Sequence, residues 1–389
     1  MSLTCRLFES IDDVDLDAWE RVHSECGAPI FMDPRFVGAV EISMRQSYRF
    51  WYVIIYENGR PVACACLTAM KIDLADFADP HVASIVRHLP RVFSRFRNLK
   101  VFLCGLPGLP ADKALTVSSP ASSPQILSVL DGLICDLAAQ ERSDGIIYKE
   151  FGSDDLEWTK PLLNLGYRRV LTPPMHFFRP VFNDFSHYCA TLKTRYRQQI
   201  NRSIRKLSPG ISLSILTDPQ QIVRLYTSEV HDLYHQMVAK AEMKLEVLPI
   251  EFFHQLTLRL SGEIELIVYS KDSKAIAFGW CLHAGPSYHL LYAGLDYQFN
   301  SEFDLYFNLH YAALDRAMRK RVSMIHVGQS ANAFKARIGC YSEPLYAFTK
   351  GLGPFMSRVV RYGATFLVAQ TPAMPPSNIF KVSSANSNS

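Results

Sequence analysis

Apolar and polar residues in the first half of the chain change period several times, and each change predicts an element. A helical period covers residues 15–26 and 31–43. Two β-rich runs at residues 49–70 then flank Asn58-Gly59, which predicts a hairpin because Asn-Gly is the strongest short turn signal. The pattern continues with a strand at 100–105, a Gly-, Pro- and Ser-rich loop at 106–124, a helix at 125–140, a strand at 145–151, and a helix end with a terminal strand at 162–178.

The second half follows a similar order. A helix is expected at residues 184–207, and Asp218 is expected to cap a long helix that ends near residue 243. A three-strand meander follows at residues 264–295. The remaining predicted elements are a strand at 211–217, helices at 249–260, 302–320 and 331–338, strands at 324–327 and 345–349, an amphipathic helix at 354–370, and a disordered tail at 371–389.

Both halves therefore follow one order: helices, antiparallel hairpin strands, a strand, a helix, a strand and a terminal strand. This order predicts an α/β fold of the α+β kind with mixed sheets, and it disfavours a doubly wound parallel sheet. We expect an N-terminal domain at residues 1–180, a second domain at 181–352, and a C-terminal helix and tail at 353–389.

Composition places the chain among ordinary globular proteins, since 48% of its residues are hydrophobic and 20% are charged. The nine cysteines are odd in number and scattered, which argues against a disulfide framework and for a reducing compartment, the cytoplasm. No signal peptide and no apolar run of membrane-spanning length is expected.

Several common chemistries lack a motif. The sequence contains no G-x-S-x-G elbow, no P-loop and no G-x-G-x-x-G run, so hydrolase, NTPase and dinucleotide functions have no support. His231 and His235 have the spacing of zinc ligands on a helix, but no third ligand follows at a familiar spacing. We therefore predict no metal site and no tightly bound cofactor.

The helix LKTRYRQQINRSIRKL (192–207) carries cations and no acidic residue. The positive side chains on this helix repel one another. An anionic ligand would relieve that repulsion, and the candidates are a phosphate, a carrier-protein helix and a tRNA backbone. A solvated basic face is the alternative interpretation. The candidate anion-binding residues are Arg195, Arg197, Arg202, Arg205 and Lys206, together with Lys193.

Three segments of the second half resemble the FemAB-type and related acyltransferase-like domains of the GNAT superfamily. They are the basic helix at residues 192–207, the meander at 264–296 with its small-residue and Tyr-rich strands, and the segment IHVGQSANAFKARIG at 325–339 with its Phe-Lys step. The resemblance implies two tandem GNAT-like domains and acyl transfer. It departs from simple GNAT enzymes after Leu295, where DYQFNSEFD stands in place of the Gly-rich loop that binds the acetyl-CoA pyrophosphate.

Acyl transfer to an amine needs a base and a donor to the developing oxyanion. By the resemblance, Lys335 offers its ammonium to a phosphate or an oxyanion. Gln329, in the small-residue turn before it, is a further candidate for binding the donor or its phosphate. Asp296, at a strand end, is a candidate base, and Tyr292 a candidate acid or oxyanion donor. The alternatives are a solvated lysine, a turn aspartate bonded to local backbone, and a core tyrosine.

The sequence thus predicts an N-acyl- or aminoacyltransferase that attacks a thioester or ester with an amine. Acyl-CoA, an acyl-carrier protein and aminoacyl-tRNA all remain open as co-substrate, and the acceptor is a small-molecule amine. DNA is not an expected partner. The alternative function is a non-catalytic binding module for an anionic polymer, a carrier protein or a membrane surface, with Arg358 and Arg361 at peripheral membrane contact.

Overall fold

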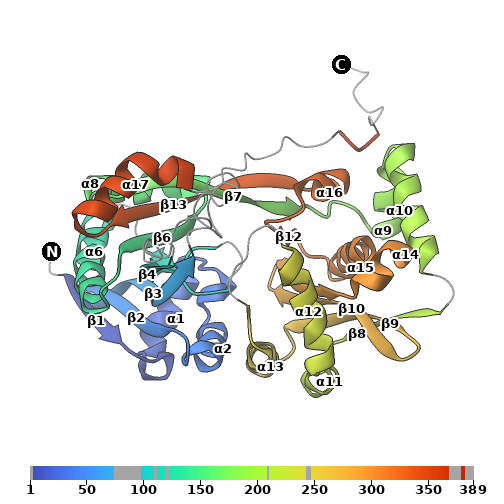
Figure 1. The fold of residues 1–389 in the computed structure, drawn as a ribbon, viewed down its shortest axis with the longest axis horizontal. Helices are drawn as coiled ribbons and strands as arrows, with labels where there is room; N and C mark the ends of the chain where they lie inside the picture. The colour runs from blue at the N-terminus through green and yellow to red at the C-terminus, as the bar shows by residue number, and fades with distance from the viewer. Residues whose placement is uncertain are drawn as a thin grey trace. The chain divides into compact units, whose positions relative to one another are not determined.

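The computed structural model describes residues 3–73, 98–108, 112–118, 122–207, 210–241, 247–367 and 378–381, and it forms two compact units (Figure 1). Unit 1 contains Met1–Pro174, Met243–Arg259 and Pro344–Pro372, and unit 2 contains Met175–Glu242, Leu260–Glu343 and Ala373–Ser389. Each unit therefore includes segments from both halves of the sequence. The domain boundaries at residues 180 and 352 stay a prediction, because compactness alone does not say which segments fold together.

Unit 1 is built on a mixed sheet, as the sequence predicts. The strand order is β1 (Leu3–Phe8), β2 (Arg49–Glu57), β3 (Arg60–Asp73), β4 (Asn98–Cys104), β6 (Gly145–Phe151) and β13 (Tyr341–Gly351), and β5 (Leu115–Val117) pairs with β3. The helices are α1 (Leu16–Glu25), α2 (Pro34–Met44), α6 (Ser123–Gln140), α7 (Leu156–Thr159), α8 (Pro161–Asn164), α13 (Ile250–Arg259) and α17 (Gly353–Leu367). Strand β5 corrects the prediction that residues 106–124 are all loop; residues 109–111 and 119–121 lie outside the described part.

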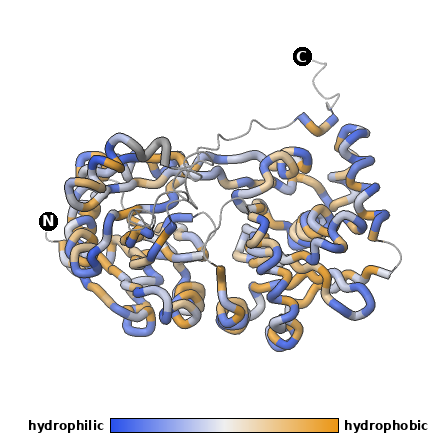
Figure 2. The backbone as a smooth tube through the Cα atoms, in the orientation of Figure 1, coloured by the Kyte–Doolittle hydropathy of each residue, from blue (hydrophilic) through white to orange (hydrophobic). Residues whose placement is uncertain are grey.

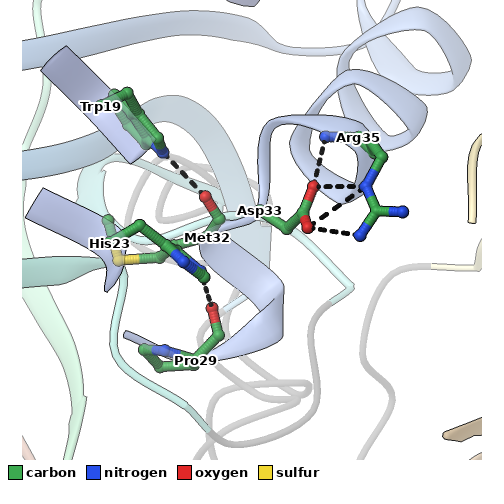
Figure 3. Close-up of polar contacts among 6 residues, drawn as sticks. All are labelled: Trp19, His23, Pro29, Met32, Asp33 and Arg35. Carbon is green, nitrogen blue, oxygen red and sulfur yellow. Dashed lines mark hydrogen bonds and ion pairs between the residues drawn. The ribbon is translucent and has the colours of Figure 1, made fainter. Parts of the chain in front are cut away.

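Local signals explain the start of unit 1. The hairpin β2–β3 turns at Asn58 and Gly59, both of which have positive φ, as the turn requires. Asp33 caps α2, and its carboxylate accepts the Arg35 backbone N–H at 2.8 Å. Figure 3 shows this cap beside the Trp19 indole, which donates to the Met32 carbonyl at 2.8 Å. These contacts fix α1 and α2 to the loop between them.

Unit 2 has its own mixed sheet. Its order is β7 (Arg168–Phe178, whose last residues belong to this unit), β12 (Met324–Gly328), β11 (Ser287–Leu295), β10 (Lys274–Ala284), β9 (Ile264–Lys271) and β8 (Ile211–Leu216). The predicted meander is confirmed as β9–β10–β11, which are antiparallel. Strand β12 pairs parallel with β11 and antiparallel with the end of β7.

Two helices predicted as continuous in unit 2 are broken, and the helix predicted at 302–320 is confirmed from Leu305 onward, after a break at Asp304 that follows a short helix that was not predicted. The first two are replaced by α9 (Phe185–Thr191) and α10 (Thr194–Lys206), and by α11 (Pro219–Leu225) and α12 (Ser228–Lys240), and the third region contains α14 (Tyr297–Phe303) and α15 (Leu305–Arg319). The short α16 (Asn332–Arg337) is confirmed. Each break has a physical cause in the tertiary structure. Leu192 forms a β-bridge with Phe380, the buried Tyr226 hydroxyl reaches His231, and Asp304 is left-handed.

The C-terminal tail is partly ordered, which corrects another prediction. Ile379 is fully buried in unit 2, and its carbonyl accepts the Lys193 backbone N–H at 2.9 Å. Phe380 lies against Gly339, where a Cβ atom would come within 2.9 Å of the Phe380 ring. Residues 371–377 and 382–389 lie outside the described residues.

Hydropathy follows the layers of each unit. Figure 2 shows the strands of each sheet largely apolar and most of α10 hydrophilic. Among the described helices, none has the length and apolar character needed to cross a bilayer. All nine cysteines are free thiols, as the odd, scattered count predicts.

Candidate functional site

The two parallel strands of unit 2 separate from each other along their length. Strand β11 pairs with β12 through Ser287, Tyr288 and His289, whereas its pairing with β10 continues to Leu295. A β-bulge opposite Trp280 and Cys281 inserts one extra residue into β11 near the point of separation. Beyond His289, β11 no longer pairs with β12, and we call the region between the two separating strands the wedge. A backbone that is unpaired at such a place can pair with a ligand.

Helix α12 packs closely against the far part of β11. A Cβ atom on Gly294 would lie 2.3 Å from the Phe278 ring and 2.7 Å from the backbone nitrogen of Tyr234. This approach requires glycine and brings α12 to one face of the sheet. Gly279, which points to the other face, lies against Leu309 of α15. The wedge thus has α12 on one face and α15 on the other.

Lys335 lies in α16, directly after β12, and is 1% exposed. A Cβ atom on Gly328, the last residue of β12, would lie 3.6 Å from the lysine Nζ. Burial lowers the pKa of Lys335 to about 7, and the nearby Cys340 thiol opposes that shift. Among the residues that the structure describes, no carboxylate pairs with this ammonium. The alternative interpretation, a solvated lysine, is wrong.

The aromatic face of α16 fixes the lysine in place. Phe334 stacks on Phe307 with ring centroids 4.8 Å apart and meets Tyr306 edge-on at 5.4 Å. Because Phe334 is pinned to the first turns of α15, the neighbouring Lys335 points into the unit rather than to solvent.

A hollow of about 170 Å³ lies where β11 ends and α15 begins. Asn300 and Asp304 line it. The Asn300 side-chain oxygen accepts the Tyr306 backbone N–H at 3.0 Å, so a donor at the start of α15 is already satisfied. The Asp304 carboxylate accepts from Ser203 and Lys206, each at 2.8 Å. Asn300 and Asp304 therefore occupy the N-terminus of α15, a position that would otherwise favour a phosphate.

Comparison with known families matches residues 194–336 to the acetyltransferase (GNAT) domain. The matched region contains the wedge, the hollow and Lys335. The second half of this chain carries a GNAT domain. Acyl transfer is the reaction of this domain class, and the chain is an acyltransferase. No curated protein matches the sequence.

Solved structures share the fold of almost the whole chain. FemX is 11% identical with a TM-score of 0.57, covering 92% of this chain and 100% of its own. A tandem GNAT protein from the clavulanic acid biosynthesis pathway is 13% identical with a TM-score of 0.53, covering 91% and 99%. L-PGS from Bacillus licheniformis is 10% identical with a TM-score of 0.51, covering 86% and 91%. The predicted tandem GNAT-like fold is confirmed.

The other candidate catalytic residues of the GNAT domain lie on β11 and just after it. Tyr292 is paired with Trp280 and its ring meets Tyr234 of α12 at 6.4 Å, so it lies on the α12 face of the wedge. Asp296 caps α14, where its carboxylate accepts the Gln298 backbone N–H at 2.9 Å. This is the local backbone role considered from the sequence, and the catalytic role of either residue stays a prediction.

The basic helix α10 belongs to the GNAT domain and keeps most of its charge unpaired. Lys206 pairs with Asp304 at 2.8 Å, which gives the helix one carboxylate that the sequence did not reveal. Arg205 donates to the carbonyl of Asn201 in its own helix. In the described part of the chain, Arg195, Arg197 and Arg202 have no ion-pair partner, and Arg195 and Arg202 are exposed.

Arg197 lies apart from the exposed row on α10. With Asn201 and Ile204 it lines a hollow of about 350 Å³ against α9, where Cys189 also points. Burial raises the pKa of the Cys189 thiol to about 11 despite the nearby Arg197 charge, so the thiol is protonated at neutral pH. Gln329, the remaining candidate, follows Gly328 directly in the turn before α16.

Other titratable groups clarify what the site contains. The His231 and His235 rings meet edge-on with centroids 4.5 Å apart, and a His231 ring nitrogen lies 3.1 Å from the Tyr226 hydroxyl. Among the described residues, no cluster of His, Cys, Asp and Glu could hold a metal ion. Sequence reasoning missed His176 and His310, which lie close enough to Lys335 for its charge to lower the pKa of each. They come from β7 and α15, and no local spacing connects them.

Proposed function

We propose that unit 2 transfers an acyl or aminoacyl group to an amine in the wedge between β11 and β12, and that Lys335 stabilises the oxyanion. The observation that carries this proposal is a buried lysine with no carboxylate partner in the described chain, next to the last residue of β12. A lysine at this depth destabilises the fold unless a negative charge is supplied.

The charge of Lys335 supports a transition-state role. With a pKa of about 7, the side chain is partly neutral when the site is empty. As an amine attacks the carbonyl carbon, the carbon–nitrogen bond forms and the carbonyl oxygen becomes negative. That oxygen favours the protonated lysine, so the interaction is stronger in the transition state than in the ground state. The tetrahedral species then expels the donor thiolate or alkoxide, and the amine loses a proton to a base.

The acceptor amine belongs on the α12 face of the wedge in this proposal. Tyr292 lies on the part of β11 that no longer pairs with β12, and Asp296 directly follows that part. Asp296 retains a carboxylate oxygen besides the one that caps α14, so it remains a candidate base. The loops around this face would select which amine binds. We therefore assign only the class of the acceptor, a small-molecule amine.

The donor that we favour is carried on a polyanion. The start of α15 is capped by Asn300 and flanked by Asp304, which disfavours the pyrophosphate of free acyl-CoA there. The unpaired arginines of α10, with Gln329 and Arg197 nearer the core, offer a surface for phosphates or acidic side chains instead. Aminoacyl-tRNA or a loaded carrier protein therefore fits the site better than acyl-CoA.

A peripheral membrane contact remains a separate proposal for α17. This helix exposes Phe355 and Tyr362, which are 53% and 73% exposed, and Arg358 and Arg361 lie near them. Aromatic and basic side chains on one amphipathic helix suit an anionic lipid surface. Such a contact would hold the enzyme at a membrane surface. The nine free thiols support the cytoplasm as its compartment.

The test is a donor panel. The purified full chain is incubated with a set of acyl-CoAs, a loaded carrier protein and charged tRNA, each with simple amines, and loss of the acyl group from each donor is followed by mass. We expect turnover with a polyanionic donor, lost in Lys335→Ala and weakened by salt. Turnover with acyl-CoA alone would overturn the donor assignment, and turnover that survives Lys335→Ala would overturn the site.

For the anion surface, Arg202→Ala and Arg195→Ala are compared with Lys274→Ala, which removes a cation from the start of β10 instead. The α10 variants should raise KM and reduce the salt dependence of KM, because each removes one charge contact with the donor. Equal effects from all three variants would remove α10 from the donor site.

A further inference from the structure

Strand β8 is the last strand of the unit 2 sheet, and only one of its two edges is paired. It pairs antiparallel with β9 from Ile211↔Lys271 to Leu216↔Leu266 (Figure 1). Among the strands that the structure describes, none pairs with the other edge of β8. The backbone N–H and C=O groups along this outer edge are therefore a template on which a further strand can pair.

The apolar side chains of β8 are exposed, although those beside them on β9 are buried. Leu213 is 48% exposed and Ile215 is 36% exposed, whereas their ladder partners Tyr269 and Ile267 are 3% and 0% exposed. Residues opposite each other in a ladder lie on the same face of the sheet. The apolar face of the unit 2 sheet therefore continues onto β8 and is uncovered there.

The two outermost strands of the molecule differ in how they are protected. Natural edge strands commonly carry a charged residue or a proline that prevents pairing with another chain. Strand β1, the edge strand of the unit 1 sheet, has the exposed Arg6 in its sequence LTCRLF. Strand β8 has the sequence ISLSIL, with neither a charged residue nor a proline. Its edge is therefore suited to pairing.

The sequence of β8 matches a second copy of itself. Residues 211–215 read ISLSI, which is the same in both directions. Opposite residues of an antiparallel ladder agree in whether their N–H groups point to the partner strand, so odd-numbered residues of β8 must oppose odd-numbered residues of the copy. The isoleucines and leucine of the copy then continue the apolar face, and the serines of both copies meet on the other face.

We propose that two copies of this chain form a two-fold symmetric dimer by antiparallel pairing of their β8 edges, with Leu213 opposite the partner subunit's Leu213. This register places Ile211 opposite the partner subunit's Ile215 and Ser212 opposite the partner subunit's Ser214. A two-fold contact uses the same surface on both copies, so the assembly closes at two chains. The proposal does not depend on the acyl-transfer function.

The contact is expected to be weak. Each copy contributes one strand of 6 residues. A pair of strands of this length buries less than the roughly 1,200 Å² at which standard protein interfaces begin. We therefore expect a Kd on the order of 10 to 100 µM, and a dimer that is populated only in concentrated protein.

Sedimentation velocity of the purified full chain tests the association. The concentration is varied from about 5 to about 500 µM, which brackets the expected Kd. The weight-average mass should rise from the 44.1 kDa of one chain toward twice that value. The buffer contains about 0.15 M salt, because the net charge of +4 on each copy opposes association at low ionic strength.

Leu213→Lys tests the surface. It places two ammonium groups opposite each other at the two-fold axis and should raise the Kd at least about 10-fold. The matched control is Leu258→Lys, which changes a leucine of α13 that is 43% exposed. The control should leave the Kd within about 2-fold, since surface substitutions outside a contact have small effects. Thermal unfolding of each variant identifies any loss of folding.

A charge exchange tests the register. Leu213→Glu alone should weaken the dimer as Leu213→Lys does, because two carboxylates then meet at the axis. An equimolar mixture of the two variants should form a mixed dimer with a Kd within about 3-fold of that of the natural protein, because opposite charges meet across the axis. Misfolding of either variant would not produce this recovery.

Hydrogen exchange locates the contact on the chain. The backbone amides of β8 that point away from β9 should exchange more slowly at about 500 µM than at about 5 µM, whereas the amides of β1 should be unchanged. A mass that stays at 44.1 kDa over the whole range overturns the proposal. A dimer that folded Leu213→Lys leaves intact, or protection that appears on β1 and not on β8, assigns association to another surface. A mixture that stays monomeric removes Leu213 from the axis.

Discussion

Unit 1 keeps its two parallel strands paired to the end of the first, whereas unit 2 lets them separate. In unit 1, β4 and β6 pair from Val101↔Gly145 to Cys104↔Tyr148, and Cys104 is the last residue of β4. In unit 2 the corresponding pairing stops at His289, and β11 continues to Leu295. The same order of elements therefore gives a closed sheet in one unit and a wedge in the other.

The lysines near the two strand ends differ in the same way. In unit 1, Lys113 pairs with Asp155 at 2.5 Å, and Asp155 also accepts from the Trp158 indole at 2.9 Å. In unit 2, Lys335 has no carboxylate partner in the described chain. A paired lysine stabilises structure, and an unpaired buried one is available to a ligand. This difference between the two lysines agrees with our proposal that the reaction takes place in unit 2.

Removing each lysine in turn is the most direct test of this difference between the units. Lys335→Ala should lower kcat about 10²- to 10³-fold, the usual loss of one oxyanion donor. Lys113→Ala should leave kcat within about 3-fold and cost roughly 1–3 kcal/mol of stability, because Asp155 loses its counter-ion. Steady-state kinetics and urea unfolding check both. A large kcat loss in folded Lys113→Ala would place chemistry in unit 1 as well.

A substitution at Ile379 tests whether the stability of unit 2, and not that of unit 1, depends on the described residues of the tail. Ile379→Ala removes a fully buried side chain from unit 2 and should destabilise it by about 2–4 kcal/mol. Val181→Ala, at a side chain 79% exposed in the same unit, is the control and should change stability by less than about 0.5 kcal/mol. Hydrogen exchange resolves the two units. Equal loss of protection in unit 1 would contradict the assignment of the tail.

Lys335 should also make stability depend on pH. Its folded pKa of about 7 lies below the unfolded value of 10.5, so the unfolded chain binds the extra proton in that window. Stability therefore rises as pH increases from about 7 to 10.5. Lys335→Met should be more stable than the natural protein at pH 6, by roughly 1–3 kcal/mol, and the difference should shrink above pH 10. A pH-independent difference would show that the lysine ionises freely.

The smallest expected difference between the two units concerns the stability that one buried carboxylate contributes to each of them. Burial alone would raise the pKa of Glu265, but hydrogen bonds from Arg316 and Lys320 outweigh it and lower the pKa. Its stabilising contribution is therefore present above the unfolded pKa and lost as pH falls through the folded one.

Glu265→Gln should cost unit 2 about 1–2 kcal/mol at pH 7 and little at pH 3. The unit 1 counterpart is Asp131→Asn, since Asp131 pairs with Lys350 at 3.1 Å. Denaturant unfolding at the two pH values, followed by probes in each unit, checks the pair. A loss that persists at pH 3 would assign the effect of Glu265→Gln to packing.

Much of the fold was predictable because local patterns carried it. The Asn58-Gly59 turn, the Asp218 cap and the three-strand meander are written in adjacent residues, and the structure confirms each. The helix breaks at Leu192 and Asp304 were not predictable, because both depend on residues far along the chain. Strand β5 was missed for a similar reason, since its three residues are stabilised by β3 rather than by their own pattern.

The sequence by itself determined the alternation of elements, the caps and turns, the acyl-transfer resemblance and the position of Lys335 in a Phe-Lys step. Tertiary structure alone decided that this lysine is buried, that its charge influences the pKa of His176 and His310, and that β11 separates from β12 in unit 2. Local order depends on neighbours within a few residues, which a sequence displays directly. Burial and the pKa of a side chain depend on everything packed around it, and that is set only when distant segments meet.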